Sequence, residues 1–274
     1  MTLISNIHKN AFKNKVIIIT GGAGGLGCAL VRQLLNCGAK VVALDLTIDK
    51  LNTAELVDNK NLLSIAVDIT DNQALQKAVE QTMTYFGQID ILFNNAGITH
   101  MSTFENTTVE LFNTIMKVNF TASVNITRLC LPYLIESKGQ IVAISSVAGF
   151  APLYGRSAYS ASKHAMEGFF QSLASEVKDK GIGVLIVCPS FVKSRPELTA
   201  KVNQGISSPG ALKKSTNGEQ LSPEYAAKKI IEATIKGQRI LYLGKVSNIA
   251  HWLYLLLPKL YLRLMVKNAQ KEFS

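Results

Sequence analysis

The chain is poor in the residues that build metal centres and disulfide frameworks. Its 274 residues include four cysteines, and no two of them form a CxxC pair. No histidines and cysteines cluster with the spacing of metal ligands, so the sequence predicts no metal site and reduced thiols in a cytoplasmic protein. The first 15 residues contain no apolar run followed by a small-residue cleavage site, and we therefore expect no secretory signal.

Acidic residues are scarce toward the C-terminus. The net charge of the chain is +10, and residues 228–274 carry nine lysines and arginines against only Glu232 and Glu272. A basic segment can bind nucleic acid, but no nucleic-acid-binding motif accompanies this one, so we expect no nucleic-acid partner. A negatively charged membrane surface is the better candidate.

The C-terminal segment also lacks an apolar run long enough to span a membrane. Residues 248–274 form a basic, apolar extension that we expect to be helical. Pro258, Lys259 and Arg263 interrupt it too often for it to cross ~30 Å of hydrocarbon. Trp, Tyr and Leu beside Lys and Arg suit a helix lying in the membrane interface, which makes peripheral membrane association through residues 249–274 one hypothesis. Packing on a sister subunit and covering a substrate pocket are equally open alternatives.

Short apolar runs alternate with helical stretches along the rest of the chain. An apolar content of 47% is ample for a buried core. This alternation predicts one α/β domain over residues 1–247, with a doubly wound parallel sheet of about seven strands and helices on both faces. Polar motifs follow the strands at their carboxyl ends, where ligands bind in such sheets. We expect the strands at residues 16–19, 41–44, 63–67, 91–93, 140–144, 183–188 and 240–243.

A glycine-rich loop follows the first strand and opens a helix, which is the setting of a dinucleotide-binding site. Its glycines let the backbone approach a pyrophosphate at the helix N-terminus. The loop residues that we expect to bind the cofactor are Gly21, Gly22, Ala23, Gly24, Gly25, Leu26 and Gly27.

Asp45 ends the second strand, where a carboxylate can accept hydrogen bonds from ribose hydroxyls and repel a 2′-phosphate. No Lys or Arg occupies positions 22–26 or 46–49. The sequence therefore predicts a preference for NAD over NADP, and the alternative is that Asp45 only caps a turn.

Tyr159 and Lys163 lie four residues apart, a spacing that places both side chains on one face of a helix. A free tyrosine ionises near pH ~10, and an adjacent ammonium group favours the phenolate. The Ser146 hydroxyl could hold a carbonyl or alcohol oxygen beside that phenol. Together with the glycine loop, these residues predict hydride transfer between a carbonyl/alcohol pair and a nicotinamide.

From about Lys15 to Leu243 the sequence resembles the short-chain dehydrogenase/reductase family. The resemblance rests on TGGAGGLG (20–27), NNAG (94–97), Val-Asn-Phe around Asn119, ISSVAG (144–149) and YSASK (159–163). It implies that Tyr159 is the acid/base, Ser146 positions the substrate oxygen, Lys163 binds ribose and lowers the pKa of the tyrosine, and Asn119 holds a proton-relaying water. It also implies a homodimer or homotetramer.

The same resemblance implies further cofactor contacts. Asp68 would contact the adenine region, and Asn95 would stabilise the central strand. The family's Pro-Gly after the sixth strand is Pro189-Ser190 here, and its usual Thr is Ser194, whose hydroxyl could still meet the nicotinamide carboxamide. The additional cofactor positions are Asp68, Ile69, Asn95, Ala96, Gly97, Pro189, Val192 and Ser194.

A long segment at about residues 191–222 corresponds to the substrate lid of this family. YSASKHAMEGFF resembles members that act on lipid-like, steroid or retinoid alcohols and ketones. We therefore expect an NAD-dependent oxidoreductase for a secondary alcohol or ketone on a hydrophobic substrate. The alternatives are a non-catalytic NAD-binding regulator, a membrane-recruited scaffold and a reductase of 3-oxoacyl thioesters. The apolar candidates for substrate contact are Val147, Leu153, Tyr154 and Phe191.

Overall fold

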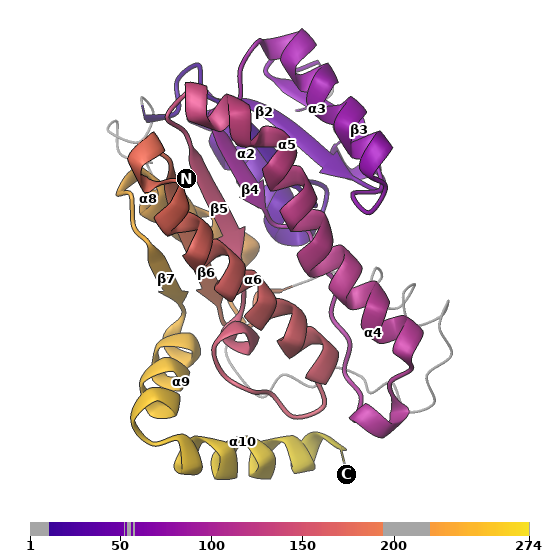
Figure 1. The fold of residues 1–274 in the computed structure, drawn as a ribbon, viewed down its shortest axis with the longest axis vertical. Helices are drawn as coiled ribbons and strands as arrows, with labels where there is room; N and C mark the ends of the chain where they lie inside the picture. The colour runs from indigo at the N-terminus through magenta and orange to yellow at the C-terminus, as the bar shows by residue number, and fades with distance from the viewer. Residues whose placement is uncertain (1–10, 52, 54–55, 57, 194–219, 274) are drawn as a thin grey trace.

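A single parallel sheet organises the protein. The computed structural model describes residues 11–51, 53, 56, 58–193 and 220–273 (Figure 1). Within these ranges, seven parallel strands pair in the order β3-β2-β1-β4-β5-β6-β7. The predicted doubly wound sheet is confirmed, with each strand limit within one residue of its expected position. The strands are β1 (Val16–Thr20), β2 (Lys40–Asp45), β3 (Leu62–Ala66), β4 (Ile91–Asn94), β5 (Gln140–Ile144), β6 (Gly183–Pro189) and β7 (Ile240–Leu243).

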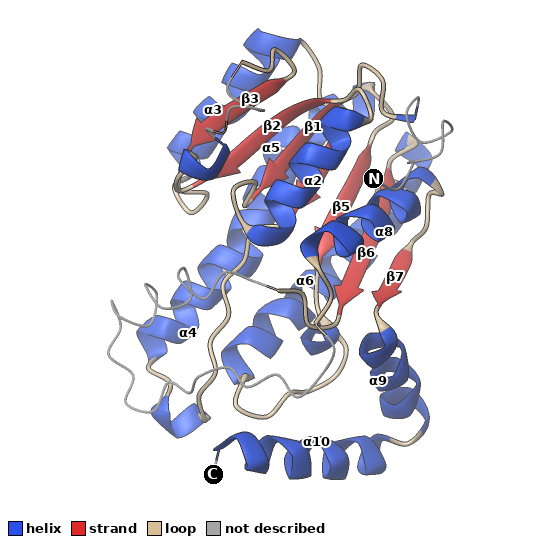
Figure 2. Ribbon diagram, turned by 180° about the vertical axis from the view of Figure 1, so that it is seen from behind, coloured by secondary structure: helices blue, strands red, loops and turns tan. Residues whose placement is uncertain are grey.

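Helices cover both faces of the sheet. On one face lie α2 (Gly25–Asn36) and α8 (Pro223–Ile235) (Figure 2). The other carries α3 (Asn72–Phe86), α5 (Ala122–Glu136) and α6 (Ser157–Glu176) (Figure 1). Successive side chains of a strand point to opposite faces, so β1 sends Ile17 and Ile19 into the core beneath α2 and α8. Val16 and Ile18 enter the core beneath the other three helices. This double burial explains why β1 is apolar throughout.

The remaining short elements connect these layers. α4 (Val109–Met116) continues through η3 (Lys117–Thr121), a turn of π-helix, directly into α5. The helical region is therefore continuous through Asn119, with a widened turn at that residue. The 3-10 turns are η1 (Asp49–Leu51), η2 (Phe104–Asn106), η4 (Val147–Gly149) and η5 (Lys178–Lys180).

The C-terminal segment forms two helices, α9 (Lys245–Leu256) and α10 (Pro258–Phe273). Proline is well tolerated at the first position of a helix but not in its interior, so Pro258 ends the first helix and starts the second. The expected boundary at residue 248 falls inside α9, and α10 runs across the end of the molecule toward which β6 and β7 point (Figures 1 and 2). Among the described residues, no helix has both the length and the apolar character that a membrane span requires.

The strand order reverses at the centre of the sheet. β1 pairs with β2 on one side and with β4 on the other, so the connections leave β1 and β4 in opposite directions. Such a switch point leaves a crevice outside the carboxyl ends of the strands. The predicted glycine loop and the NNAG motif both lie there.

Candidate active site

The glycine loop brings two backbones too close together for side chains. Gly21 has a φ of +66°, and a Cβ on it would lie 2.9 Å from Cα of Ala96. A Cβ on Gly27 would collide with the carbonyl oxygen of Gly21. Gly24 precedes α2 and has no side chain to cap that helix, whose first turn holds no acidic residue. The loop at residues 21–27, which we call the glycine cradle, therefore exposes backbone N–H groups at the positive end of the α2 dipole. Such a site fits a pyrophosphate.

Thr20 joins this loop to the NNAG motif. Its hydroxyl accepts hydrogen bonds from the backbone N–H groups of Asn95 and Ala96, both at 3.0 Å, and donates to the carbonyl of Phe93 at 3.3 Å. The side-chain amide of Asn95 donates in turn to the carbonyls of Thr20 and Gly21. Thr20 was not among the predicted site residues, although it opens the TGGAGGLG motif.

Asp45 lies against the glycine loop. Its carboxylate accepts hydrogen bonds from the backbone N–H groups of Ala23 and Leu46, each at 2.8 Å. Asp45 thus caps the turn after β2 and at the same time fixes a negative charge at the loop where a cofactor ribose would lie. These hydrogen bonds show Asp45 as a turn cap, whereas its contact with a ribose and the preference for NAD stay predictions.

The other described residues predicted to contact a cofactor lie at or beyond the carboxyl ends of β3, β4 and β6. Asp68 is exposed and accepts from the N–H of Thr70, whereas Ile69 is buried in the core. Val192 forms a parallel bridge with Leu221, and the Lys193 carbonyl beside it lies against Gly25 of the glycine loop. Ser194 and most of the expected lid, residues 194–219, lie outside the described residues.

Helix α6 and strand β5 together position the predicted acid/base group. Tyr159 and Lys163 share one face of α6, and Nζ of Lys163 is 5.9 Å from the centre of the Tyr159 ring. Ser146 follows β5, accepts from the N–H of Ala148 at 3.2 Å and forms a hydrogen bond with Tyr159. A phenol, a hydroxyl and an ammonium group therefore meet beside the crevice, as the spacing predicts.

Burial has the largest effect on the electrostatics of Tyr159 and Lys163. Burial raises the pKa of the Tyr159 phenol, while the hydrogen bond from Ser146 and the positive charge of Arg156 act in the opposite direction. The Nζ of Lys163 donates to the carbonyl of Ile144 at 2.8 Å, and burial lowers the pKa of its ammonium group to about 8. Burial therefore dominates the pKa of both groups. The lowering of the Tyr159 pKa by Lys163 stays a prediction.

Asn119 is fully buried in the π-helical turn and holds two segments together. Its side-chain oxygen accepts from the N–H of Ile98 at 2.8 Å, and its amide donates to the Ile98 carbonyl at 3.0 Å and to the hydroxyl of Ser162 at 2.9 Å. Ser162 donates to the carbonyl of Tyr159. Asn119 thus ties the chain after NNAG to the helix that carries Tyr159, and its role in a water relay stays a prediction.

A buried polar network behind Lys163 was missed at the level of sequence. Glu167 is 8% exposed, and its carboxylate accepts from the hydroxyl of Ser145 at 2.7 Å and from the thiol of Cys188 at 3.3 Å. Burial raises the pKa of Glu167, and its charge opposes the lowering of the Lys163 pKa. A Cβ on Gly149 would collide with both Glu167 and Ser145, so a larger residue there would displace these two side chains. The four-residue spacing of Lys163 and Glu167 was the available signal.

The predicted substrate residues divide between two surroundings. Val147 and Leu153 pack against the C-terminal helices, in an apolar cluster with Ala250 and Tyr261. The backbone N–H of Tyr154 donates to the sulfur of Met265. Phe191 is partly buried at the start of the expected lid. Three of the four therefore lie where the tail covers the loop after Ser146.

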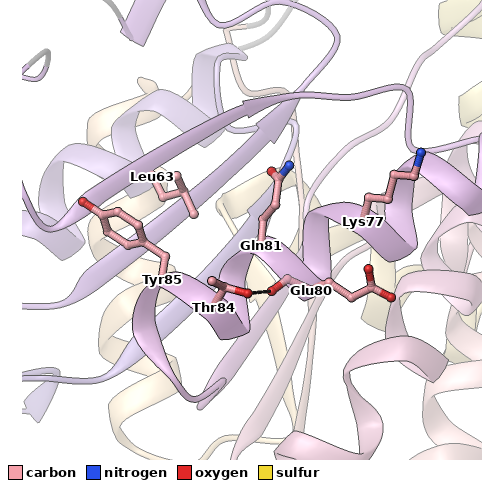
Figure 3. Close-up of a pocket in the computed structure, with 6 residues that line it drawn as sticks. All are labelled: Leu63, Lys77, Glu80, Gln81, Thr84 and Tyr85. Carbon is pink, nitrogen blue, oxygen red and sulfur yellow. Dashed lines mark hydrogen bonds between the residues drawn. The ribbon is translucent and has the colours of Figure 1, made fainter.

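Polar groups, in contrast, lie beside the phenol. A small hollow next to Tyr159 is lined by residues that include His100, Ser102 and Arg156, and the guanidinium of Arg156 donates to the hydroxyl of Thr99 at 2.6 Å. A larger, open hollow lies along α3 between Leu63 and Tyr85 (Figure 3). None of the six residues lining that second hollow belongs to the site.

The fold and this constellation define a class of enzyme. The sequence profile described as short chain dehydrogenase matches residues 15–206. The chain belongs to the short-chain dehydrogenase/reductase family and is an NAD(P)-dependent oxidoreductase, so both predictions are confirmed.

Curated relatives and solved structures agree with this assignment. Dehydrogenase/reductase SDR family member 7B of Rattus norvegicus is 34% identical, over 98% of this chain and 86% of that protein. An SDR family protein 7-like of Anopheles gambiae is also 34% identical, over 94% of this chain and 84% of that protein.

Among solved structures, a short-chain dehydrogenase from Streptomyces avermitilis matches with a TM-score of 0.75 and 27% identity, covering 94% of this chain and 98% of that one. A short chain dehydrogenase from Burkholderia cenocepacia in complex with NADP matches with a TM-score of 0.77 and 20% identity, covering 93% of this chain and 98% of that one. At this identity the match supports the fold alone.

Proposed function

We propose that this protein interconverts a secondary alcohol and a ketone on a hydrophobic substrate, with Tyr159 as acid/base and NAD as the preferred cofactor. The observation that carries the proposal is the meeting of Tyr159, Ser146 and Lys163 at the carboxyl edge of β5, beside the glycine cradle. A bound nicotinamide dinucleotide supplies or accepts the hydride. The cradle formed by Gly21 and Gly27 would hold its pyrophosphate.

The side chains divide the proton chemistry between them. The Ser146 hydroxyl donates a hydrogen bond to the substrate oxygen and orients it toward Tyr159. Burial raises the pKa of Tyr159, so the phenol is protonated at neutral pH and can donate its proton to a ketone oxygen during reduction. In the opposite direction the phenolate takes the proton of the alcohol. Lys163 would bind the ribose of the cofactor through its ammonium group.

The Tyr159→Phe variant tests this mechanism. Loss of the phenolic oxygen should reduce turnover by about 10²–10⁴-fold, the usual contribution of a general acid. NADH binding, measured by fluorescence titration, should stay unchanged. Tyr133→Phe on α5 removes a phenol elsewhere and serves as the matched control. Equal turnover of Tyr159→Phe and the unmodified protein would refute the role of Tyr159.

The NAD preference is supported by the position of Asp45. The charge of its carboxylate would repel a 2′-phosphate, and the same group accepts from the N–H of Ala23. Asp45→Asn keeps an oxygen to accept that hydrogen bond and removes only the charge. We expect the ratio of NADPH to NADH dissociation constants to fall in this variant. An unchanged ratio would show that Asp45 only shapes the loop.

The hydrophobic substrate class rests on the resemblance of YSASKHAMEGFF to family members that act on lipid-like, steroid or retinoid alcohols and ketones. Val147 and Ala151 do not add to this support, because they pack against Ala250 and Tyr261 of the same chain. The test is NADH absorbance against a panel of steroid, retinoid, small secondary alcohols and 3-oxoacyl thioesters. Turnover confined to small polar alcohols would contradict the substrate class. NADH binding without any turnover, identical in Tyr159→Phe, would favour a non-catalytic regulator.

A homo-oligomer belongs to the same proposal, because the family generally assembles from several subunits. Light scattering coupled to gel filtration distinguishes a dimer or tetramer from a monomer of 29.8 kDa.

A further inference from the structure

The two C-terminal helices are docked on the domain by one of their faces only. Tyr261 is 7% exposed and its hydroxyl donates to the carbonyl of Pro152 at 3.0 Å. Ser247 is fully buried and donates to the carbonyl of Cys188 at 2.6 Å. Ala250 completes the contact with the loop after Ser146. The inner face of α9 and α10 therefore already has its partners within the domain.

The outer face of the same helices is apolar and exposed. We define the C-terminal apolar face as Ile249, Trp252, Leu255, Leu256, Leu257 and Leu260, each between 44% and 67% exposed. Ile249, Trp252 and Leu256 follow the i, i+3, i+7 spacing of a single helix stripe. Of the large apolar side chains exposed in the described residues, more than half come from residues 246–264. Contiguous exposure on this scale marks an interaction surface.

The charges around this face indicate its partner. Lys245, Lys259, Arg263 and Lys267 are exposed along α9 and α10. No aspartate or glutamate occurs between residues 245 and 271. Two copies of this face brought together would therefore juxtapose like charges with no acidic groups to pair with them. An anionic lipid surface complements the cations and accepts the apolar side chains at the same time.

We propose that the C-terminal apolar face binds an anionic phospholipid membrane, with α9 and α10 lying in the interfacial layer. Trp252, Leu256 and their apolar neighbours enter the boundary between head groups and acyl chains, while Lys259 and Arg263 contact the head groups. The inner faces of the helices contact the loop after Ser146, so the bound membrane would lie on the side of the helices opposite to that loop. The binding does not depend on the proposed reaction, and the two can be tested separately.

The protein supplies its own probe, because Trp252 is its only tryptophan. The experiment adds vesicles of phosphatidylcholine alone, or of phosphatidylcholine with phosphatidylserine, to the chain of 274 residues. We expect flotation with the anionic vesicles, a blue shift of the Trp252 emission and its quenching by brominated acyl chains. Raised salt should weaken the binding, because a basic side chain near an anionic surface contributes about a fivefold change in affinity.

Two variants separate the apolar from the electrostatic contribution. Leu256→Glu places a charge in the apolar face and should reduce vesicle binding by at least ~tenfold. The double variant Lys259→Gln, Arg263→Gln should weaken binding to anionic vesicles and leave the residual binding to phosphatidylcholine unchanged. Tyr85→Glu changes an exposed apolar residue on α3, far from the tail, and is the matched control. Because Leu256 is 67% exposed, its replacement should leave NADH binding and the unfolding midpoint unchanged.

Three results would overturn the proposal. The first is absence of flotation and of a spectral shift with anionic vesicles. The second is equal vesicle binding by Leu256→Glu and the unmodified protein. The third is a lipid-free dimer, detected by light scattering, in which Trp252 emission is already blue-shifted and which Leu256→Glu dissociates. That last result would assign the face to a second copy of the chain.

Discussion

Replacing Lys163 with methionine should abolish turnover and yet raise the free energy of unfolding at neutral pH. Lys163 is 3% exposed, and burial lowers its pKa from 10.5 to about 8. A pKa shift of this size means that keeping Lys163 charged costs about 3 kcal/mol more in the folded state than in the unfolded state. Methionine keeps most of the side-chain length but loses the hydrogen bond to the Ile144 carbonyl, worth about 1 kcal/mol. The net expectation is stabilisation by about 2 kcal/mol at pH 7.

The pH dependence of this gain follows from the direction of the pKa shift. Between pH 8 and 10.5 the unfolded chain still binds the Lys163 proton, whereas the folded chain has lost it. Stability contributed by this group therefore rises with pH over that window. The free energy of unfolding of the unmodified protein therefore rises with pH, whereas that of Lys163→Met lacks this contribution. The difference in free energy of unfolding between the two proteins should shrink by about 2 kcal/mol between pH 7 and about pH 9.5.

Urea unfolding followed by circular dichroism at both pH values measures this difference. Lys178→Met replaces an exposed lysine in η5, the turn that follows α6, and should change the free energy of unfolding by less than about 0.5 kcal/mol at either pH. The reasoning is refuted when Lys163→Met is less stable than the unmodified protein at pH 7, or when the gap between them does not narrow with rising pH.

Four further substitutions, at three residues, test other contacts of the site. Glu167→Ala should lower the free energy of unfolding by about 1–3 kcal/mol because the Ser145 hydroxyl loses its acceptor, while Glu167→Gln keeps an acceptor oxygen and should cost less. Chemical denaturation measures both, and equal losses would contradict the hydrogen-bond argument. Gly27→Ala should abolish NADH binding in a fluorescence titration, since its Cβ would collide with Gly21; an unchanged dissociation constant would argue against the cradle. Thr20→Val keeps the shape of the side chain but removes three hydrogen bonds. We expect weaker NADH binding and a free energy of unfolding lower by about 2 kcal/mol. No change in either quantity would exclude a role of Thr20 in joining the glycine loop to the NNAG motif.

The sheet and the cradle could be predicted from sequence because both depend on local pattern. Runs such as residues 16–19 are apolar without alternation, which a strand buried on both faces requires. Gly21 and Gly27 mark positions where a Cβ has no room, and their spacing is visible in the sequence. The carboxyl ends of parallel strands meet at one edge, so the order of the motifs was enough to bring them together.

The environment of Lys163 could not be predicted in the same way. Helix periodicity places Glu167 on its face, but the partners of Glu167 come from β5 and β6, which are distant in the sequence. An ammonium group lowers the pKa of a neighbouring phenol, whereas burial raises it, so the net direction depends on how deeply the phenol is buried. Here burial dominates, and it is a property of the assembled layers.

The surroundings of Val147 and Leu153 also required the three-dimensional structure. Both are apolar and follow Ser146, which favoured a role in substrate contact. Their packing against the tail depends on the change of direction at Pro258, which brings Tyr261 back to the loop. Apolar character alone could not distinguish a residue facing substrate from one facing a helix of the same chain.

The tail therefore has two roles that a truncation would confound. Removing residues 249–274 would eliminate the outer apolar face, but it would also uncover Val147 and delete the hydrogen bond between Tyr261 and Pro152. A truncated protein that failed to bind vesicles could simply have lost the structure of the loop beside Ser146. Leu256→Glu changes only the outer face, because the inner contacts are made by Ser247, Ala250 and Tyr261. A variant that keeps turnover and loses vesicle binding would separate the membrane surface from the active-site wall, which no deletion of the tail can do.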